Sequence, residues 1–370
     1  MAKKIIYADN AATTQMSQAA MDSMIRYLST DYSNASQPYS FSRYSKKALR
    51  GARETIADCI GAKPDEIYFT SGGSESDNWV IKNAWLNGQN ILTAEIEHHA
   101  ILNACQFVAR QNGKVSYLPV FANGIICPDE IKKRLSQDSL ISIMMANNEI
   151  GTIEPIRQYG LMAREMSATI HTDAVQAMGH IDINVKELDI DLLSASGHKF
   201  NGPKGIGFLY VRQGTKIQSL INGGTQEFGL RAGTENVAAI VAMAVALREN
   251  IEEMEDNQRH LHNLEENLVD KLRKSSVSVV RNGTNQLPGL MSLSFENLDG
   301  ETLLHRLDLL GICVSTGSAC DSKNTQVSHV LKAINLPLEY AKGTIRVSFG
   351  KYNTMEDSNA IAEALIKIAR

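Results

Sequence analysis

Residues 67–76 decide the fold, and they read Ile67-Tyr68-Phe69-Thr70-Ser71-Gly72-Gly73-Ser74-Glu75-Ser76. The first four residues have high β-propensity, the glycines allow a tight turn, and the polar residues that follow are typical of a helix start. The first N–H groups of a helix and its positive dipole end attract a phosphate. Gly73 and Ser74 are therefore candidate phosphate ligands, and routine capping of the helix by a serine is the alternative.

The same segment excludes the two common nucleotide-binding loops. The chain has no G-x-x-x-x-G-K-[ST] sequence here, so a P-loop is excluded. The glycine spacing also fails the G-x-G-x-x-G pattern of dinucleotide-binding folds.

Short β-rich runs alternate with helical patterns on both sides of this segment. Apolar strands separated by helices imply parallel pairing, with helices on both faces of one sheet. We predict strands at Ile67–Thr70, Ile91–Thr93, Val115–Val120, Leu140–Met145, Ile170–Asp173, Leu192–Ala195 and Gly207–Val211. We predict helices near Ser45–Ile60, Ser74–Asn87, Ala100–Gln111, Asp129–Leu135 and Ile156–Met166.

A second alternation of strand and helix patterns begins after a long helical pattern that runs from about Glu235 past Leu272. It predicts strands at Val277–Val280, Met291–Phe295 and Thr344–Phe349, with a helix near Glu301–Leu310. The fold class that we predict is therefore α/β, with a mostly parallel central sheet, plus a smaller α+β domain. The large domain is expected over residues 14–256, and the small domain over 1–13 and 257–370.

Composition narrows the class of protein. The chain has 370 residues and a formal net charge of −4, so it lacks the basic surface typical of proteins that bind nucleic acid or anionic membranes. No signal peptide and no apolar run of about 20 residues is present. The five cysteines form no C-x-x-C pair, which argues against a disulfide framework or a structural zinc site: Cys59, Cys105, Cys127, Cys313 and Cys320. We therefore expect a reduced, soluble, cytoplasmic protein without a metal site.

Two residues that follow predicted strands carry the chemistry. Asp173 ends one strand and Lys199 comes just after another, and ligand sites in parallel sheets lie at that edge. Asp173 can stabilise a protonated ring nitrogen, and Lys199 can form a Schiff base with an aldehyde. Helix capping by Asp173 and a solvated loop lysine are the ordinary alternatives. Ser196 and His198, beside Lys199, can donate to a phosphate or simply form a turn.

The three features are more informative together than apart. A phosphate cradle, a carboxylate and a lysine on one edge of one sheet are the groups that pyridoxal phosphate requires. One shared site accounts for all three, whereas the ordinary alternatives need three unrelated causes. The sequence therefore predicts a pyridoxal 5'-phosphate site.

Seven motifs, taken in order, resemble those of the cysteine desulfurases, which belong to the class V aminotransferases. They are Asp9-Asn10-Ala11-Ala12-Thr13-Thr14, Thr70-Ser71-Gly72-Gly73-Ser74-Glu75-Ser76, Ala146-Asn147-Asn148-Glu149-Ile150-Gly151, His171-Thr172-Asp173-Ala174-Val175-Gln176, Ser196-Gly197-His198-Lys199, Arg231-Ala232-Gly233-Thr234-Glu235-Asn236 and Ser318-Ala319-Cys320. The resemblance spans nearly the whole chain and implies the type I pyridoxal-phosphate-dependent transferase fold. The spacing from Cys320 to Ser328-His329-Val330-Leu331 favours the longer-loop group of the family.

The resemblance also implies roles for single residues. Lys199 would hold the cofactor as a Schiff base, Asp173 would pair with its ring nitrogen, and His98 would stack on the ring and move protons. The remaining cofactor contacts would come from Gly73, Ser74, Asn148, Gln176, Ser196, His198 and, from the partner subunit, Thr234. Asn148 and Arg346 would hold the substrate carboxylate, and Cys320 would be the nucleophile on a mobile loop.

The implied activity is the conversion of L-cysteine to L-alanine through a persulfide on Cys320. The sulfur would pass to an acceptor protein for iron–sulfur cluster assembly or tRNA thiolation. The implied assembly is a homodimer that binds neither nucleic acid nor membrane directly. The alternatives are another class V enzyme, such as a selenocysteine lyase or a transaminase, and a non-catalytic protein that keeps the fold as a binding module.

Two of the implied positions are open to a different role. The adjacent His98 and His99 would suggest a metal site, but no set of Cys, His or Asp at ligand spacing accompanies them. Arg346 lies in a predicted strand and could instead form a structural ion pair.

Overall fold

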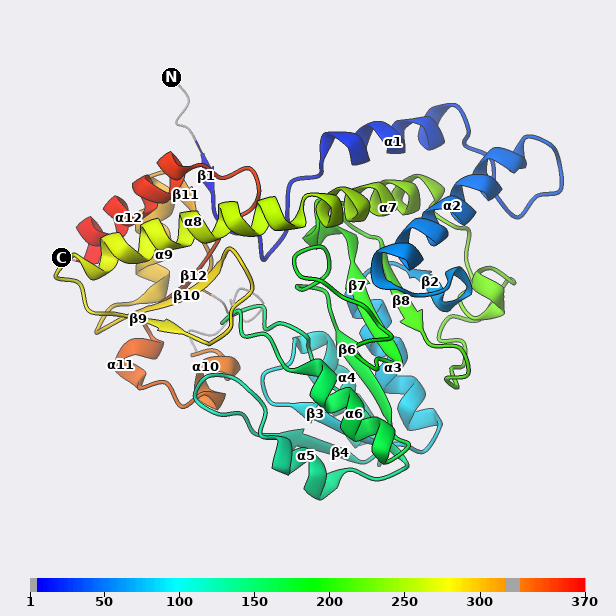
Figure 1. Cartoon of the computed structure of the whole chain (residues 1–370), viewed down its shortest axis with the longest axis horizontal. Helices are drawn as coiled ribbons and strands as arrows, with labels where there is room; N and C mark the ends of the chain where they lie inside the picture. The colour runs from blue at the N-terminus through cyan, green and yellow to red at the C-terminus, as the bar shows by residue number, and fades with distance from the viewer. Residues whose placement is uncertain (1–4, 317–326, 370) are drawn as a thin grey trace.

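A seven-stranded sheet forms the centre of the larger part of the molecule, as the computed structural model in Figure 1 shows. The structure describes residues 5–316 and 327–369. The strand order is β2-β8-β7-β6-β5-β3-β4. The bounds are β2 (Ile67–Thr70), β3 (Asn90–Ala94), β4 (Val115–Leu118), β5 (Ser139–Ser142), β6 (Thr169–Asp173), β7 (Leu192–Ser196) and β8 (Gly207–Val211).

Six of these strands run in one direction, and β8 is antiparallel to both of its neighbours, β2 and β7. The mostly parallel sheet that the sequence predicts is thus confirmed, and β8 is the exception. The reason lies between β7 and β8, where only the short 3₁₀ turn η2 (Gly197–Lys199) and a tight bend separate the strands. A connection this short returns the chain antiparallel, because parallel neighbours need a long crossover.

Helices cover both faces of the sheet, as predicted. α3 (Gly73–Leu86) and α4 (His99–Arg110) pack on the face that carries Ile91, Leu140 and Leu192. The next residue along each strand points to the opposite face, which packs against helices that include α2, α6 and α7. The bounds of the remaining helices in this part are α1 (Gln18–Ser29), α2 (Ser42–Ile60), α5 (Pro128–Arg134), α6 (Ile156–Glu165) and α7 (Val237–Glu252).

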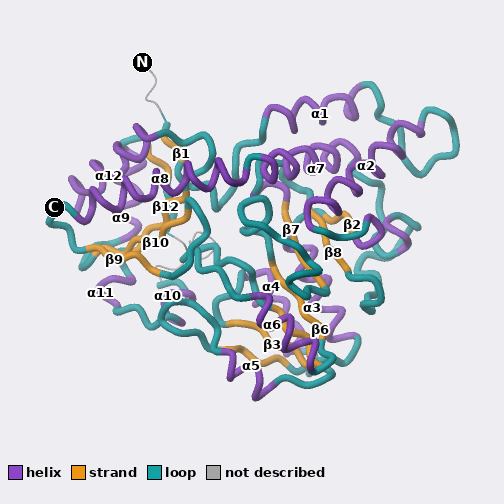
Figure 2. The backbone as a smooth tube through the Cα atoms, in the orientation of Figure 1, coloured by secondary structure: helices purple, strands orange, loops and turns teal. Residues whose placement is uncertain are grey.

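A second, smaller part has its own sheet and its own apolar core (Figure 2). Its three strands are antiparallel in the order β12-β10-β9, and β1 pairs with β11 beside them. The strands are β1 (Ile6–Tyr7), β9 (Val279–Asn282), β10 (Leu290–Phe295), β11 (Ile312–Cys313) and β12 (Thr344–Ser348). The helices are α8 (Met254–Arg273), α9 (Gly300–Leu309), α10 (His329–Ala333), α11 (Leu338–Ala341) and α12 (Met355–Ala369).

The long helical pattern predicted from Glu235 past Leu272 is two helices. α7 ends at Glu252 and α8 begins at Met254, with Glu253 between them outside helical geometry (φ −96°, ψ 4°). Figure 1 shows the two helices end to end, bridging the two parts. The strand predicted at Val277–Val280 is shifted along the chain, since β9 covers Val279–Asn282.

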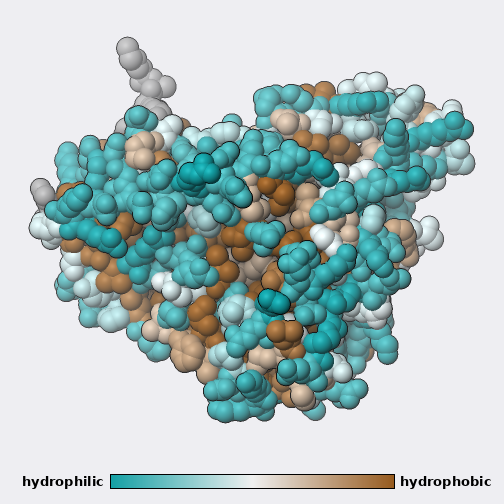
Figure 3. All heavy atoms as spheres, in the orientation of Figure 1, coloured by the Kyte–Doolittle hydropathy of each residue, from teal (hydrophilic) through white to brown (hydrophobic). Residues whose placement is uncertain are grey.

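The N-terminal segment links the two parts a second time. β1 belongs to the smaller part, and the Thr14 N–H donates to the His198 carbonyl in the larger one. Residues between them therefore cross the junction, and they bring Ala11 and Ala12 to the carboxyl edge of the central sheet. On the face in Figure 3, hydrophobic residues gather along the middle of the molecule and hydrophilic ones toward its ends. None of the helices in the described ranges is both long and apolar enough to cross a membrane.

Candidate active site

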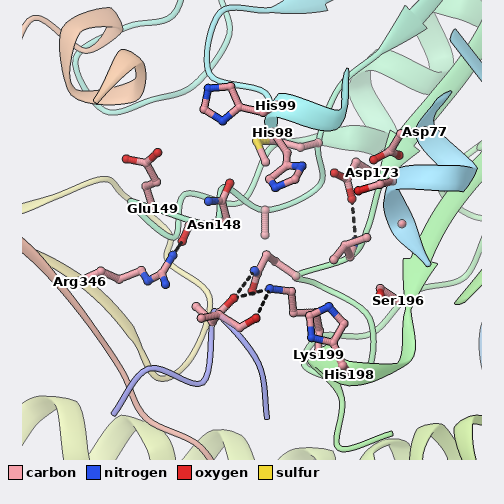
Figure 4. Close-up of a pocket in the computed structure, with 18 of the residues that line it drawn as sticks. Asp77, His98, His99, Asn148, Glu149, Asp173, Ser196, His198, Lys199 and Arg346 are labelled. Carbon is pink, nitrogen blue, oxygen red and sulfur yellow. Dashed lines mark hydrogen bonds between the residues drawn. The ribbon is translucent and has the colours of Figure 1, made fainter. Parts of the chain in front are cut away.

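A cavity of about 280 Å³ opens at the carboxyl edge of the parallel strands, where the two parts meet. Every described residue that the sequence predicts to be a site residue lines this cavity, except Thr234. Figure 4 shows Lys199, Asp173, His98 and Asn148 on its wall. The full lining is Ala11, Ala12, Gly73, Ser74, Asp77, His98, His99, Met144, Ala146, Asn148, Glu149, Asp173, Val175, Gln176, Ser196, His198, Lys199, His329 and Arg346.

The first turn of α3 forms one end of the cavity. Its N-cap is Gly72, which has no side chain, so no capping side chain covers the N–H groups of Gly73 and Ser74. Gly72 has φ +147°, a conformation that side chains disfavour, and a Cβ on Gly73 would lie 2.5 Å from Val175 Cγ2. Capping by a serine, the alternative role for these residues, is therefore not what the structure has. The bare helix start remains available to an anion.

Ser196 and His198 adjoin this helix start. Ser196 ends β7, and the His198 Nδ1 atom lies 3.1 Å from the Thr13 hydroxyl. Burial lowers the pKa of His198 to about 4, and the positive charges of Lys199 and Lys204 contribute to the shift. A second hollow at this end is lined by Ala12, Thr13, Ser71, Gly72, Gly73, Ser74, Glu75, Ser196, His198, Lys204 and Gly205. Hydroxyl, imidazole and backbone donors thus surround the helix start.

Asp173 lies at the floor of the cavity, at the end of β6. One of its carboxylate oxygens accepts the Val175 N–H at 2.9 Å, so it does hold the turn that follows. The carboxyl is buried among polar groups, and the residue is 5% exposed. Burial raises the pKa of Asp173 to about 6, although the Val175 N–H and the Lys199 charge both oppose the shift. A buried acid of this kind is stabilised by any cation that enters the cavity.

Lys199 is not a solvated loop lysine. It follows β7 in η2, is only partly exposed, and its Nζ donates to the carbonyls of Ala11 at 2.6 Å and Ala12 at 2.9 Å. Its own carbonyl accepts the Nε2–H of His180 at 2.9 Å. Figure 4 shows the amine directed at the crossing N-terminal segment. These two carbonyls therefore hold the amine at the cavity wall.

His98 caps α4 and faces the cavity. Its Nδ1 accepts the Ala100 N–H at 3.1 Å, which leaves the proton of the neutral ring on Nε2. Burial lowers the pKa of His98 to about 4, and the charges of Lys199 and His99 act in the same direction. The ring is therefore neutral near pH 7. The part of the chain that the structure describes contains no cluster of three or more potential metal ligands.

Arg346 and Asn148 lie on the opposite wall. The Arg346 guanidinium pairs with Asp9 at 2.7 Å and donates to the Asn148 carbonyl at 2.9 Å, while its buried Nε has no hydrogen-bond partner. The structural ion pair considered for this arginine thus exists, and the residue also faces the cavity. Gln176 Nε2 donates to the Ala11 carbonyl at 2.8 Å.

Of the predicted site residues that the structure describes, one is not brought to the cavity. Thr234 is exposed in the loop before α7 and does not line the cavity of its own chain. Cys320 lies outside the described residues.

Sequence reasoning missed two contributions to this site. Asp77 lines the cavity one helical turn after Ser74, and the i, i+3 spacing from Ser74 was the signal that could have found it. The carbonyls of Ala11 and Ala12, which accept from Lys199, carry no sequence signal, because any residue supplies a carbonyl.

Comparison with known proteins agrees with this geometry. Residues 6–361 match the family described as aminotransferase class-V. The cysteine desulfurase IscS of Dictyoglomus turgidum is 47% identical over 373 residues, which cover 99% of this chain and 95% of that one.

Solved structures give the same result. A NifS-like protein superposes with a TM-score of 0.93 at 35% identity and covers 99% of both chains. SspA in complex with cysteine superposes with a TM-score of 0.84 at 36% identity, over 94% of this chain and 100% of that one. The likeness confirms the predicted type I transferase fold. The chain therefore belongs to the class-V aminotransferase family and, within it, to the cysteine desulfurases.

Proposed function

We propose that this protein is a pyridoxal-phosphate-dependent cysteine desulfurase. It converts L-cysteine to L-alanine and passes the sulfur to an acceptor protein, for iron–sulfur cluster assembly or tRNA thiolation. The observation that carries the proposal is the single cavity shared by the bare start of α3, the buried Asp173 carboxyl and the Lys199 amine.

The residues present fit the cofactor. The uncapped N–H groups of Gly73 and Ser74 suit its phosphate, and the space beside Gly73 is one that a Cβ would fill. Asp173 suits a protonated ring nitrogen, and Lys199 suits the aldehyde. When bound, pyridoxal phosphate supplies an electron sink for the bonds at the substrate's Cα.

Side chains of the protein supply the proton transfers and the remaining cofactor contacts. The Lys199 amine would act as the base that takes the proton from the substrate's Cα. The neutral His98 ring stacks in the cavity and presents its Nε2–H as a proton donor. Gln176 would contact the phenolic oxygen of the cofactor, and Ser196 and His198 would complete its phosphate site.

Cys320 carries the sulfur. Its thiolate forms an S–S bond to the sulfur of the substrate while the substrate's C–S bond breaks, with the electron pair remaining on carbon. The carbon then takes up a proton and leaves as alanine, and the persulfide stays on Cys320 until an acceptor thiolate removes the outer sulfur.

The proposal also covers the assembly, the domain boundaries and the location of the protein. We propose a homodimer in which Thr234 of each chain, exposed in this structure, reaches the cofactor phosphate of the other chain. We propose that the large domain spans residues 14–256 and that residues 1–13 and 257–370 form the small domain. A cytoplasmic location suits a thiol that must stay reduced.

Arg346 and Asn148 are proposed to hold the substrate carboxylate. The Arg346→Lys variant keeps the charge but loses the planar fork, so the KM for L-cysteine is expected to rise about 10- to 100-fold, the effect of losing one charge-assisted hydrogen bond. The affinity for pyridoxal phosphate is expected to stay unchanged. Steady-state kinetics and a cofactor titration measure both quantities.

The matched control is Arg281→Lys, because Arg281 also pairs with a buried carboxylate, that of Glu265, but does not line the cavity. An unchanged KM in Arg346→Lys would show that this arginine serves only its ion pair with Asp9.

The whole proposal is tested by adding pyridoxal phosphate to the purified protein and then L-cysteine. We expect an absorbance band typical of a lysine Schiff base, followed by the appearance of alanine and of sulfide when a thiol reductant is present. If no such band forms, the enzyme assignment is wrong. If alanine forms from a keto acid and an amino donor instead, the protein is a transaminase.

A further inference from the structure

A row of buried polar side chains crosses the central sheet beneath α3. Ser142, His171 and Ser194 lie on the neighbouring strands β5, β6 and β7, and each is at most 1% exposed. The Ser142 hydroxyl lies 2.9 Å from His171 Nδ1, and His171 Nε2 lies 3.0 Å from the Ser194 hydroxyl. None of these three groups has a part in the chemistry described above. Polar groups aligned through an apolar sheet require a reason, because burial of such groups is costly.

The row ends at Asp77, on the first turns of α3. Asp77 is 1% exposed and lines the cavity, and its carboxyl receives a hydrogen bond from the Ser194 hydroxyl. When the Asp77 carboxyl is ionised, Ser194 donates to it, so His171 donates its Nε2–H to Ser194 and Ser142 donates to His171 Nδ1. Burial lowers the pKa of His171 to about 3, so the ring is neutral and can carry only one such proton. All donors in the row then point toward the ionised Asp77 carboxylate.

One oxygen of Asp77 has no partner. Its Oδ1 makes no hydrogen bond, and the nearest basic atom, His171 Nε2, is 3.8 Å away. Asp77 and Asp173 lie at the same end of the cavity in Figure 4. An unpartnered carboxyl oxygen that is buried beside a second carboxyl is a place where an incoming cation gains energy.

The charges around Asp77 favour such a cation. Burial raises the pKa of Asp77 well above its usual value, and the nearby carboxyls of Asp173 and Glu97 raise it further. Lys199 acts on Asp173 and on His98, and His171 is neutral. Within the described ranges, no lysine or arginine pairs with Asp77. The floor of the cavity therefore holds more acid than the protein's own cations neutralise.

We propose that Asp77 is a positioning residue for the ring nitrogen of the cofactor: with Asp173 it forms a two-carboxyl floor, held in place by the Ser142–His171–Ser194 row, that selects a cationic nitrogen heterocycle over a neutral ring. This proposal rests on the proposed function. It assigns to Asp77 and His171 a role that acts through Asp173, which remains the group in contact with the ring. Glu97 stays outside the floor, because it does not line the cavity.

The two acids should also make the stability of the cofactor-free protein depend on pH. The folded-state pKa values of Asp77 and Asp173 lie above those of the unfolded chain, so the folded form binds more protons in the interval between them. Stability is therefore expected to fall as pH rises from about 4 through about 6 and beyond, as the two acids lose their protons. Removing the acid at position 77 should make this fall shallower.

The test uses Asp77→Asn in the cofactor-free protein, because asparagine keeps the shape and the contact with Ser194. Two ligands are titrated by absorbance or fluorescence: pyridoxal phosphate and its 1-deaza analogue, in which carbon replaces the ring nitrogen. We expect wild type to prefer pyridoxal phosphate, and Asp77→Asn to lose roughly tenfold of that preference, the equivalent of one pKa unit at the nitrogen. A general loosening of the cavity would weaken both ligands equally and leave the preference unchanged, which would overturn the proposal.

The matched control is Glu154→Gln. Glu154 is a buried acid whose pKa is raised by burial to about 7, it is held by Tyr159, and it does not line the cavity. It should alter the pH dependence of unfolding but not the preference between the two ligands. The His171→Gln variant should lose part of the preference for pyridoxal phosphate over the 1-deaza analogue, because it breaks the row without changing the cavity lining. If that variant kept the full preference, the row would have no part in positioning Asp77.

Failure of the proposed function would be recognisable separately. If wild type bound neither ligand, the cofactor assignment would be wrong, and the carboxyl floor would then be decided by denaturant unfolding of the cofactor-free protein between pH 4 and pH 8. A shallower loss of stability in Asp77→Asn than in wild type supports the floor. Identical profiles contradict it.

Discussion

Replacement of Lys199 by alanine is expected to reduce the formation of alanine from L-cysteine by about 10³-fold or more. The variant loses both the amine that binds the cofactor's aldehyde and the base that moves the Cα proton. Its two hydrogen bonds to Ala11 and Ala12 are lost as well, but these carbonyls lie at a cavity wall where water can replace the amine. Folding is therefore expected to persist, and the absorbance band of the Schiff base is expected to vanish.

Stopped assays of alanine and an absorbance spectrum measure these effects. The matched control is Lys186→Ala, because Lys186 is exposed and lies outside the cavity. Substantial turnover in Lys199→Ala, with Lys186→Ala unchanged, would mean that another amine performs the chemistry and that the strand-end lysine has been misassigned.

Replacement of Cys320 by alanine is expected to abolish the transfer of sulfur from L-cysteine to an acceptor thiol, again by about 10³-fold or more. Cofactor binding is expected to remain, because it depends on Lys199, Asp173 and the start of α3. The reason for the large effect is that none of the four described cysteines lines the cavity, and burial disfavours the thiolate in three of them. Burial raises the pKa of Cys59 to about 11 and that of Cys105 to about 12, and it also raises the pKa of Cys313.

The control for Cys320→Ala is Cys127→Ala, in which a partly buried thiol outside the cavity is removed. Transfer of labelled sulfur to a dithiol acceptor is the measurement. Transfer at the full rate in Cys320→Ala would rule out the persulfide mechanism.

The catalytic edge of the sheet could be predicted because its signals are local. Residues 67–76 form β2, the glycine turn and the start of α3, while Asp173 ends β6 and Lys199 follows β7, as the pattern indicated. Each of these features depends on residues within a few positions of one another. Parallel strands then bring them together at one edge, so a one-dimensional pattern was sufficient to predict the cavity.

What could not be predicted depends on contacts between distant segments. The ion pair of Arg346 with Asp9 joins β12 to the N-terminal segment, and no periodicity records such a pair. Cys59, Cys127 and Cys313 are only partly buried. Their exposure could not be predicted either, because local apolar neighbours do not reveal which side of an element faces solvent. The direction of β8 depends on the short connection that holds Lys199, and the strand pattern alone does not reveal that direction.

The central claim is that the sulfur atom of L-cysteine is transferred to the thiol of Cys320. Mass spectrometry of the pyridoxal-phosphate-loaded protein after a brief incubation with L-cysteine tests it most directly, with digestion under non-reducing conditions. We expect one additional sulfur atom on the peptide that contains Cys320, together with one alanine released per modified chain. Alanine without sulfur on that peptide, or added sulfur confined to Cys59, Cys105, Cys127 or Cys313, would contradict the account.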